Sequence, residues 1–129
     1  MKNLDKESVI GISALLVHAA KIDEIYSDHE KNLVKGFIKS YLNNVDTNEI
    51  LKEAELIEKN SNQLLNYTNI IKQNTLDVKK DIIKHLWKVI ISDNSVDQYE
   101  ANLMRRICGL IYFPDKECAE IKLKLLNSK

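Results

Sequence analysis

The sequence predicts an all-α protein, a bundle of about seven helices with no convincing β-strand. Apolar residues recur at helical spacing along most of the 129 residues, and this period is the main sequence signal of an amphipathic helix. The chain contains only 3 Gly and 1 Pro, which favours long helices over turn-rich β structure. An acidic segment at 23–30 is also repeated at 93–100, which predicts two related helix–corner–helix units with a pseudo-two-fold relation.

The first half of the chain predicts four helices. The first runs from about Lys6 to Ile22, and the second runs from Ser27 to about Leu42, where Asn43 and Asn44 end it. A third helix spans about 46–59, with Asp46 or Thr47 as its N-cap, and a short fourth helix follows an Asn-rich interruption. The apolar faces of these four helices are Ile12, Leu15, Leu16, Ala19 and Ile22; Leu33, Phe37 and Tyr41; Ile50, Leu51, Ala54 and Ile57; and Leu64, Tyr67 and Ile71.

The second half predicts three more helices. The fifth spans 75 to about 92 and has the strongest stripe, beside which Trp87 is the largest apolar side chain. The sixth spans about 97–111, and the seventh follows Pro114. Helices one and five are expected at the centre of the bundle. The apolar faces are Val78, Ile82, Leu86 and Val89, with Ile83 and Ile90 beside them; Leu103, Ile107 and Leu110; and Ala119, Leu123 and Leu126.

Composition limits the classes of function. A formal net charge of zero argues against a nucleic-acid binder, which usually has a basic excess. The longest apolar stretch, 107–113, is too short to span a membrane, and the N-terminus lacks the apolar run of a signal peptide. Cys108 and Cys118 form no CxxC motif, so we expect two reduced thiols. These features predict a single cytoplasmic domain over residues 1–129.

The acidic corners support two interpretations. Ser27-x-x-Glu30 has the spacing of a capping box, and residues 97–100 form an Asp-headed version of it. Capping does not explain Asp23 and Asp93, which end helices where the helix dipole disfavours an acid. Each corner could instead bring an Asp close to a Glu, and paired carboxylates suit a hard cation such as Ca²⁺ or Mg²⁺. Both interpretations stay open at this point.

The same corners carry a resemblance to a known family. Both corners resemble the TerB-like tellurite-resistance domain. The resemblance lies in segment 19–23 with Glu30 after it, and in segment 85–93 with Glu100 after it. That family has an Ala-Asp-Gly corner with an acid seven residues after the Asp, in both halves of an all-α bundle. This chain departs from the pattern, because Glu24 and Asn94 replace the corner Gly and Ser92 replaces the second Ala. The cation sites that the resemblance implies are Asp23, Glu30, Asp93 and Glu100.

The resemblance implies a stress-associated accessory domain that acts through protein contacts. We expect no catalysis, since the sequence has no P-loop, dinucleotide fingerprint or zinc signature. Tyr99 and Tyr112 are the preferred contact residues if exposed, although we expect Tyr112 to be buried in the core. Two alternatives are a structural bundle that forms a homodimer and a hydrolase that uses a metal held by the acidic residues.

Overall fold

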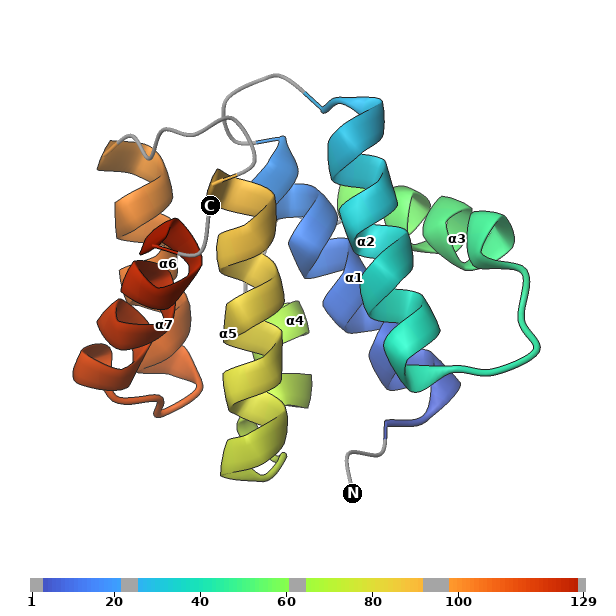
Figure 1. The fold of residues 1–129 in the computed structure, drawn as a ribbon. Coiled ribbons are helices and arrows are strands. Elements are labelled where there is room, and N and C mark those ends of the chain that lie inside the picture. The colour runs from blue at the N-terminus through green and yellow to red at the C-terminus, as the bar shows by residue number, and fades with distance from the viewer. Residues whose placement is uncertain (1–3, 22–25, 61–64, 92–97, 128–129) are drawn as a thin grey trace.

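The computed structural model describes residues 4–21, 26–60, 65–91 and 98–127, which form seven α-helices (Figure 1). No strand occurs within these ranges, and the predicted all-α class is confirmed. None of the described helices is both long and apolar enough to cross a lipid bilayer. The helices are α1 (Lys6–Ala20), α2 (Asp28–Tyr41), α3 (Thr47–Asn60), α4 (Leu65–Lys72), α5 (Leu76–Ile90), α6 (Gln98–Leu110) and α7 (Asp115–Asn127).

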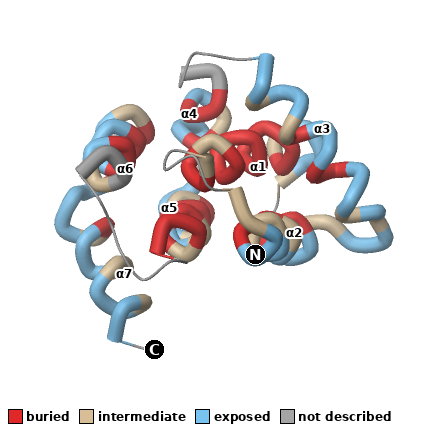
Figure 2. Tube along the Cα trace, turned by 90° about the horizontal axis from the view of Figure 1, so that it is seen from above, coloured by how far each residue is buried: buried red, intermediate tan, exposed pale blue. Residues whose placement is uncertain are grey.

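Helix α1 lies at the centre of the bundle, as predicted. All residues from Val9 to Val17 are buried, and α1 contacts α2, α3, α4 and α5 (Figure 2). A helix that is apolar on all sides can be stable only when other elements surround it. At Gly11 the approach of α4 is close, because an added Cβ would lie 2.5 Å from Cδ1 of Ile70.

Helix α5 is the second central element. The predicted stripe of Val78, Ile82, Leu86 and Val89 is buried, and the helix packs against α1, α2, α4 and α7. Trp87 is also buried, and its indole Nε1 donates a hydrogen bond to the Cys118 carbonyl oxygen at 3.2 Å. This bond fixes the first turn of α7 against α5.

The helix starts follow from capping residues visible in the sequence. The side chains of Asp5 and Thr75 accept hydrogen bonds from the backbone N–H three residues on, at 2.7 and 3.4 Å. Asp46 similarly accepts from the Asn48 N–H at 2.9 Å, which selects Asp46 over Thr47 as the cap of α3. Such bonds satisfy N–H groups that have no partner within the helix.

Helix α7 turns a different face to the core from the one predicted. Cys118 is buried, and Ile121 and Leu125 pack partly buried against the core. Leu123 and Leu126 are 56% and 36% exposed, and Ala119 is also exposed. Apolar residues occur on two sides of this helix, so their period does not select a face; the contact between Trp87 and Cys118 does.

Tyr112 is exposed, contrary to the expectation that it enters the core. The end of α6 forms a Schellman motif, in which the Phe113 N–H donates to the Cys108 carbonyl at 2.8 Å and the Tyr112 N–H donates to the Gly109 carbonyl at 3.4 Å. Tyr112 occupies the left-handed position with φ of 59°. The turn directs Tyr112 outward, where it is 72% exposed, and brings Phe113 into the core instead.

Ile57 and Leu110 are also less buried than predicted. Ile57 is 41% exposed, unlike Ile50, Leu51 and Ala54 on the preceding turns of α3. Leu110, in the last turn of α6, is only partly buried. Both residues lie near the end of a helix, where the flanking elements cover less of the surface.

The predicted duplication of the helix–corner–helix unit is not confirmed. Helix α2 packs against α1, α3 and α5, whereas the described part of α6 packs mainly against α4 and α7. Segments 22–25 and 92–97, which hold most of the two corners, lie outside the described residues.

Candidate functional site

Of the four acids predicted to hold a cation, one has a described side chain. Asp23 and Asp93 lie outside the described residues. Glu100 lies in α6, but its side chain is also outside the description. Glu30 is in the first turn of α2 and is 6% exposed. The geometry of the candidate site is therefore built from Glu30 and the side chains around the first corner.

Glu30 forms the capping box that the sequence predicts. Its Oε1 accepts hydrogen bonds from the Ser27 backbone N–H at 2.9 Å and from the Ser27 hydroxyl at 3.2 Å. The Glu30 N–H in turn donates to the Ser27 Oγ at 3.2 Å. These reciprocal bonds satisfy donors at the start of α2. A cation bound at this corner would have to share the Glu30 carboxylate with the cap.

Two further acids reach this corner from α3. The Tyr26 hydroxyl donates to Oε2 of Glu55 at 2.7 Å, and Lys21 Nζ donates to Oε1 of Glu58 at 3.0 Å. His18 Nδ1 lies 3.3 Å from the other oxygen of Glu58. These contacts tie the end of α1 and the start of α2 to α3, so they fix the two sides of the corner relative to each other.

Tyr26 lies in a strongly polar environment despite its partial burial. The ammonium groups of Lys21 and Lys31 lie 5.7 and 5.1 Å from the centre of its ring, within the range of cation–π attraction. Burial, and then the hydrogen bond to Glu55 and the charge of that carboxylate, raise the pKa of Tyr26 above its ordinary value. The hydroxyl therefore stays a proton donor to Glu55 across the physiological range.

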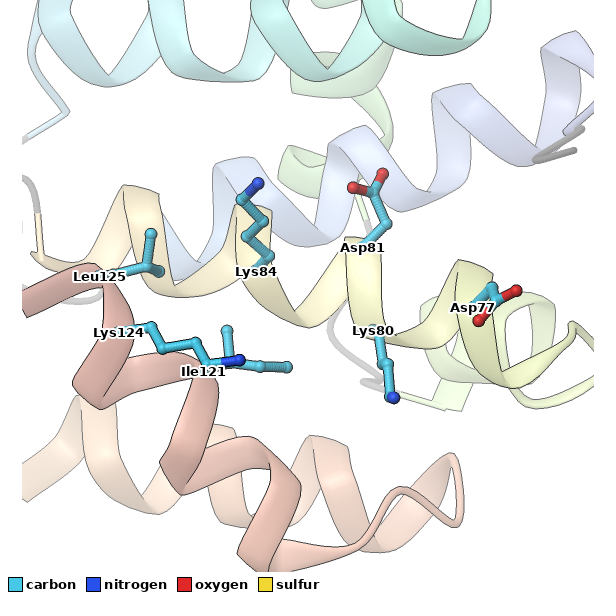
Figure 3. Close-up of a pocket in the computed structure, with 7 residues that line it drawn as sticks. All are labelled: Asp77, Lys80, Asp81, Lys84, Ile121, Lys124 and Leu125. Carbon is cyan, nitrogen blue, oxygen red and sulfur yellow. The ribbon is translucent and has the colours of Figure 1, made fainter. Parts of the chain in front are cut away.

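A surface cavity of about 500 Å³ lies between α5 and α7 (Figure 3). We call it the α5–α7 groove. Figure 3 shows Lys80 and Lys124 between the two helices, and Asp81 and Lys84 on another side of α5. Lys80 Nζ lies 3.5 Å from Oε1 of Glu117 on α7. The lining residues are Asp77, Lys80, Asp81, Lys84, Ile121, Lys124 and Leu125.

Asp81 connects the groove to α2. Its Oδ2 accepts a hydrogen bond from the Tyr41 hydroxyl at 2.7 Å and lies 3.6 Å from Nε2 of His85. The His85 ring packs edge-on against Phe37, with 5.1 Å between ring centres. Burial, then the hydrogen bond to Asp81 and its charge, raise the pKa of Tyr41. Asp81 is thus held largely in the α2–α5 contact, and the charged residues that line the groove are three lysines and two aspartates.

Comparison with known protein families shows which family the chain belongs to. The sequence model of one family, described as tellurite resistance protein TerB, matches residues 10–123. The chain belongs to the TerB family. The match extends from α1 into α7, so the fold described above is that of a TerB bundle. No curated protein and no solved structure matches the chain.

The described part of this TerB bundle contains no group of three or more His, Cys, Asp or Glu residues placed to hold a metal ion. Since Asp23 and Asp93 are outside that part, the predicted cation sites stay a prediction.

The sequence did not identify the acids of α3 that reach the corner between α1 and α2. Glu55 and Glu58 are three positions apart, which places them on one side of a helix. That spacing shows that they share a face, but it does not show that the face meets Tyr26 and Lys21. The α5–α7 groove was missed for the same reason, because the helical periods of α5 and α7 do not show which of their faces meet.

Proposed function

We propose that this TerB chain is a non-catalytic, cytoplasmic, tellurite-resistance-associated module that binds a partner protein in the α5–α7 groove. The observation that carries the proposal is the lining of the groove. Lys84 and Lys124 are exposed, and Ile121 and Leu125 provide apolar surface beside them. Exposed lysines beside apolar side chains suit an amphipathic partner segment that carries carboxylates, because opposite charges steer association and apolar contact supplies affinity.

Charge reversal in the groove tests this proposal. Tagged wild-type protein, the Lys84→Glu/Lys124→Glu variant and a Lys52→Glu/Lys59→Glu control would each be used to capture proteins from cell lysate. Lys52 and Lys59 are exposed on α3 and do not line the groove, so the control carries the same change of charge at another place. We expect a protein that is retained by the wild type and the control but lost by the groove variant, and whose binding weakens with salt. Identical captured proteins for all three baits would contradict the proposal.

We propose in addition that a divalent cation, Ca²⁺ or Mg²⁺, binds at the acidic corners. Support comes from the position of Glu30, a buried carboxylate beside the segment that holds Asp23, and from the oxygen ligands that these ions prefer. Glu30→Gln is the informative variant because Gln also completes a capping box while removing the charge. Calorimetric titration should show binding that weakens in Glu30→Gln and in Asp93→Ala. Absence of heat at millimolar metal would refute this part.

The dimer alternative is tested on the same protein preparation. Light scattering at high micromolar concentration distinguishes a monomer from a homodimer. A monomeric mass would favour the accessory module over the structural dimer.

A further inference from the structure

The two cysteines of the chain meet between α6 and α7. Cys108 lies in the third-last position of α6, and Cys118 lies in the first turn of α7. Both are buried, at 0% and 7% exposure, and are free thiols. The turn at 111–114 reverses the chain between them, and the Cys108 thiol is hydrogen-bonded to the sulfur of Cys118. The two sulfur atoms are therefore neighbours in the folded protein.

The surroundings of the two thiols differ. The hydrogen bond from Cys108 and the charge of Lys122 lower the pKa of Cys118, while burial and the charge of Asp115 oppose them, and the net shift is downward. The same hydrogen bond, together with burial, raises the pKa of Cys108 and keeps that thiol protonated. A thiolate is the nucleophilic form of cysteine, so the pair combines a nucleophile with a protonated second thiol.

Cys118, although only 7% exposed, borders the surface at one place. It lines a surface cavity of about 300 Å³ with Trp87, Met104, Arg105, Asp115 and Lys122 among the other lining residues. A water molecule occupies about 30 Å³ of liquid volume, so the cavity has room for a hydroperoxide beside Cys118. Lys122 Nζ lies 5.4 Å from the centre of the Trp87 ring, which places its positive charge beside the cavity.

We propose that Cys118 and Cys108 form a peroxide-oxidisable dithiol site, with Cys118 as the reacting thiol and Cys108 as the resolving thiol. The Cys118 sulfur attacks the O–O bond of a hydroperoxide. One oxygen is transferred to sulfur, and the other leaves and takes up a proton as an alcohol or water. The Cys108 sulfur then attacks the sulfenic acid, the S–S bond forms, the S–O bond breaks, and the hydroxyl leaves with the Cys108 proton as water. Two thiols are oxidised and one peroxide is reduced.

The expected structural result is a covalent link between α6 and α7. Within α7, Cys118 is the one residue of the described helix that is buried, while Ile121 and Leu125 pack partly buried against the core. A disulfide at this position fixes the first turn of α7 to α6, while the rest of the bundle keeps its packing. This site is separate from the α5–α7 groove and does not depend on the partner proposed there.

Oxidation of the full chain with hydrogen peroxide tests the site. At one equivalent of peroxide we expect the loss of both free thiols, a mass decrease of two hydrogens, and a single peptide containing Cys108 joined to Cys118. Dithiothreitol should restore both thiols. In Cys108→Ser the first step should stop at a sulfenic acid on Cys118 that a dimedone reagent labels. In Cys118→Ser the remaining Cys108 should stay unlabelled.

Two controls distinguish a site whose surroundings promote oxidation from the ordinary reaction of two thiols. The unfolded chain in urea gives the rate of the same thiols without their surroundings, and the folded chain should react faster. Trp87→Phe keeps an aromatic ring but removes the N–H that holds the Cys118 carbonyl in place, and should slow the reaction while circular dichroism shows a folded protein. A folded chain that reacts no faster than the unfolded one, equal labelling of both single-cysteine variants, or intermolecular disulfides alone would overturn the proposal.

Discussion

The residue in the left-handed conformation at the end of α6 allows a direct test of whether backbone strain at this turn lowers the stability of the protein. Tyr112 has φ of 59° and is 72% exposed. For an L-residue with a side chain, this conformation costs about 1–2 kcal/mol, because Cβ approaches the following carbonyl oxygen. Glycine has no Cβ, and it is the preferred residue at this position of a Schellman motif.

The comparison that isolates this cost is Tyr112→Gly against Tyr112→Ala. Both variants remove the ring, together with its contact with Lys72, whose Nζ lies 4.8 Å from the ring centre. That exposed contact contributes about 0.5–1 kcal/mol, and its loss cancels in the difference. Glycine also gives the unfolded chain more conformational freedom, which offsets part of its gain in the free energy of unfolding. We therefore expect Tyr112→Gly to be more stable than Tyr112→Ala by about 1 kcal/mol.

Urea unfolding followed by circular dichroism measures this difference, and a thermal melt should show a shift of about 4 °C for a chain of this size. Asn44, which also has a positive φ of 58°, is the matched control. Asn tolerates the left-handed region because its short polar side chain can bond locally, so Asn44→Gly should stabilise less. Equal stability of Tyr112→Gly and Tyr112→Ala would refute the assignment of strain to this turn.

Three further predictions concern the corner, the helix contacts and pH. Glu30→Ala should destabilise the protein by about 1–2 kcal/mol because Ser27 loses its acceptor, and Glu30→Gln should cost less; urea unfolding measures both. Gly36→Ala should stabilise α2 by about 1 kcal/mol, since an added Cβ meets nothing within 4 Å. Gly11→Ala should be less stable than Gly36→Ala by about 1–3 kcal/mol, because its methyl group would crowd α4. The pKa of Tyr26 is raised above its ordinary value of 10.0, so the unfolded chain loses this proton first. Stability should be full below pH 10 and fall as the pH rises, and Tyr26→Phe should reduce the fall in alkaline melts.

The corner shows how far capping chemistry can be predicted from sequence. Ser27 and Glu30 lie within one turn of each other, and their mutual bonds form in any helix that begins there. The sequence also predicted that Asp23 lies close to Glu30 at this corner, which stays a prediction, and it did not identify the acids of α3. Glu55 and Tyr26 are brought together by the packing of α3 against α1 and α2, and no local pattern specifies that packing.

The position and limits of the helices were determined by the sequence itself. The buried stripe of α5, its Thr75 cap and the wholly apolar face of α1 depend on residues within a turn or two of each other, and such short-range patterns are preserved in the chain before it folds.

The tertiary structure alone decided which surfaces and side chains meet. Helix α7 has apolar residues on two sides, and the bond from Trp87 to Cys118 selects the side that faces inward. Tyr112 is exposed because the turn after α6 assigns the core position to Phe113. Cys108 and Cys118 become neighbours only when that turn brings α6 and α7 together. In each case the deciding contact depends on how two helices pack. The helical period of one helix does not show which other helix covers its apolar face.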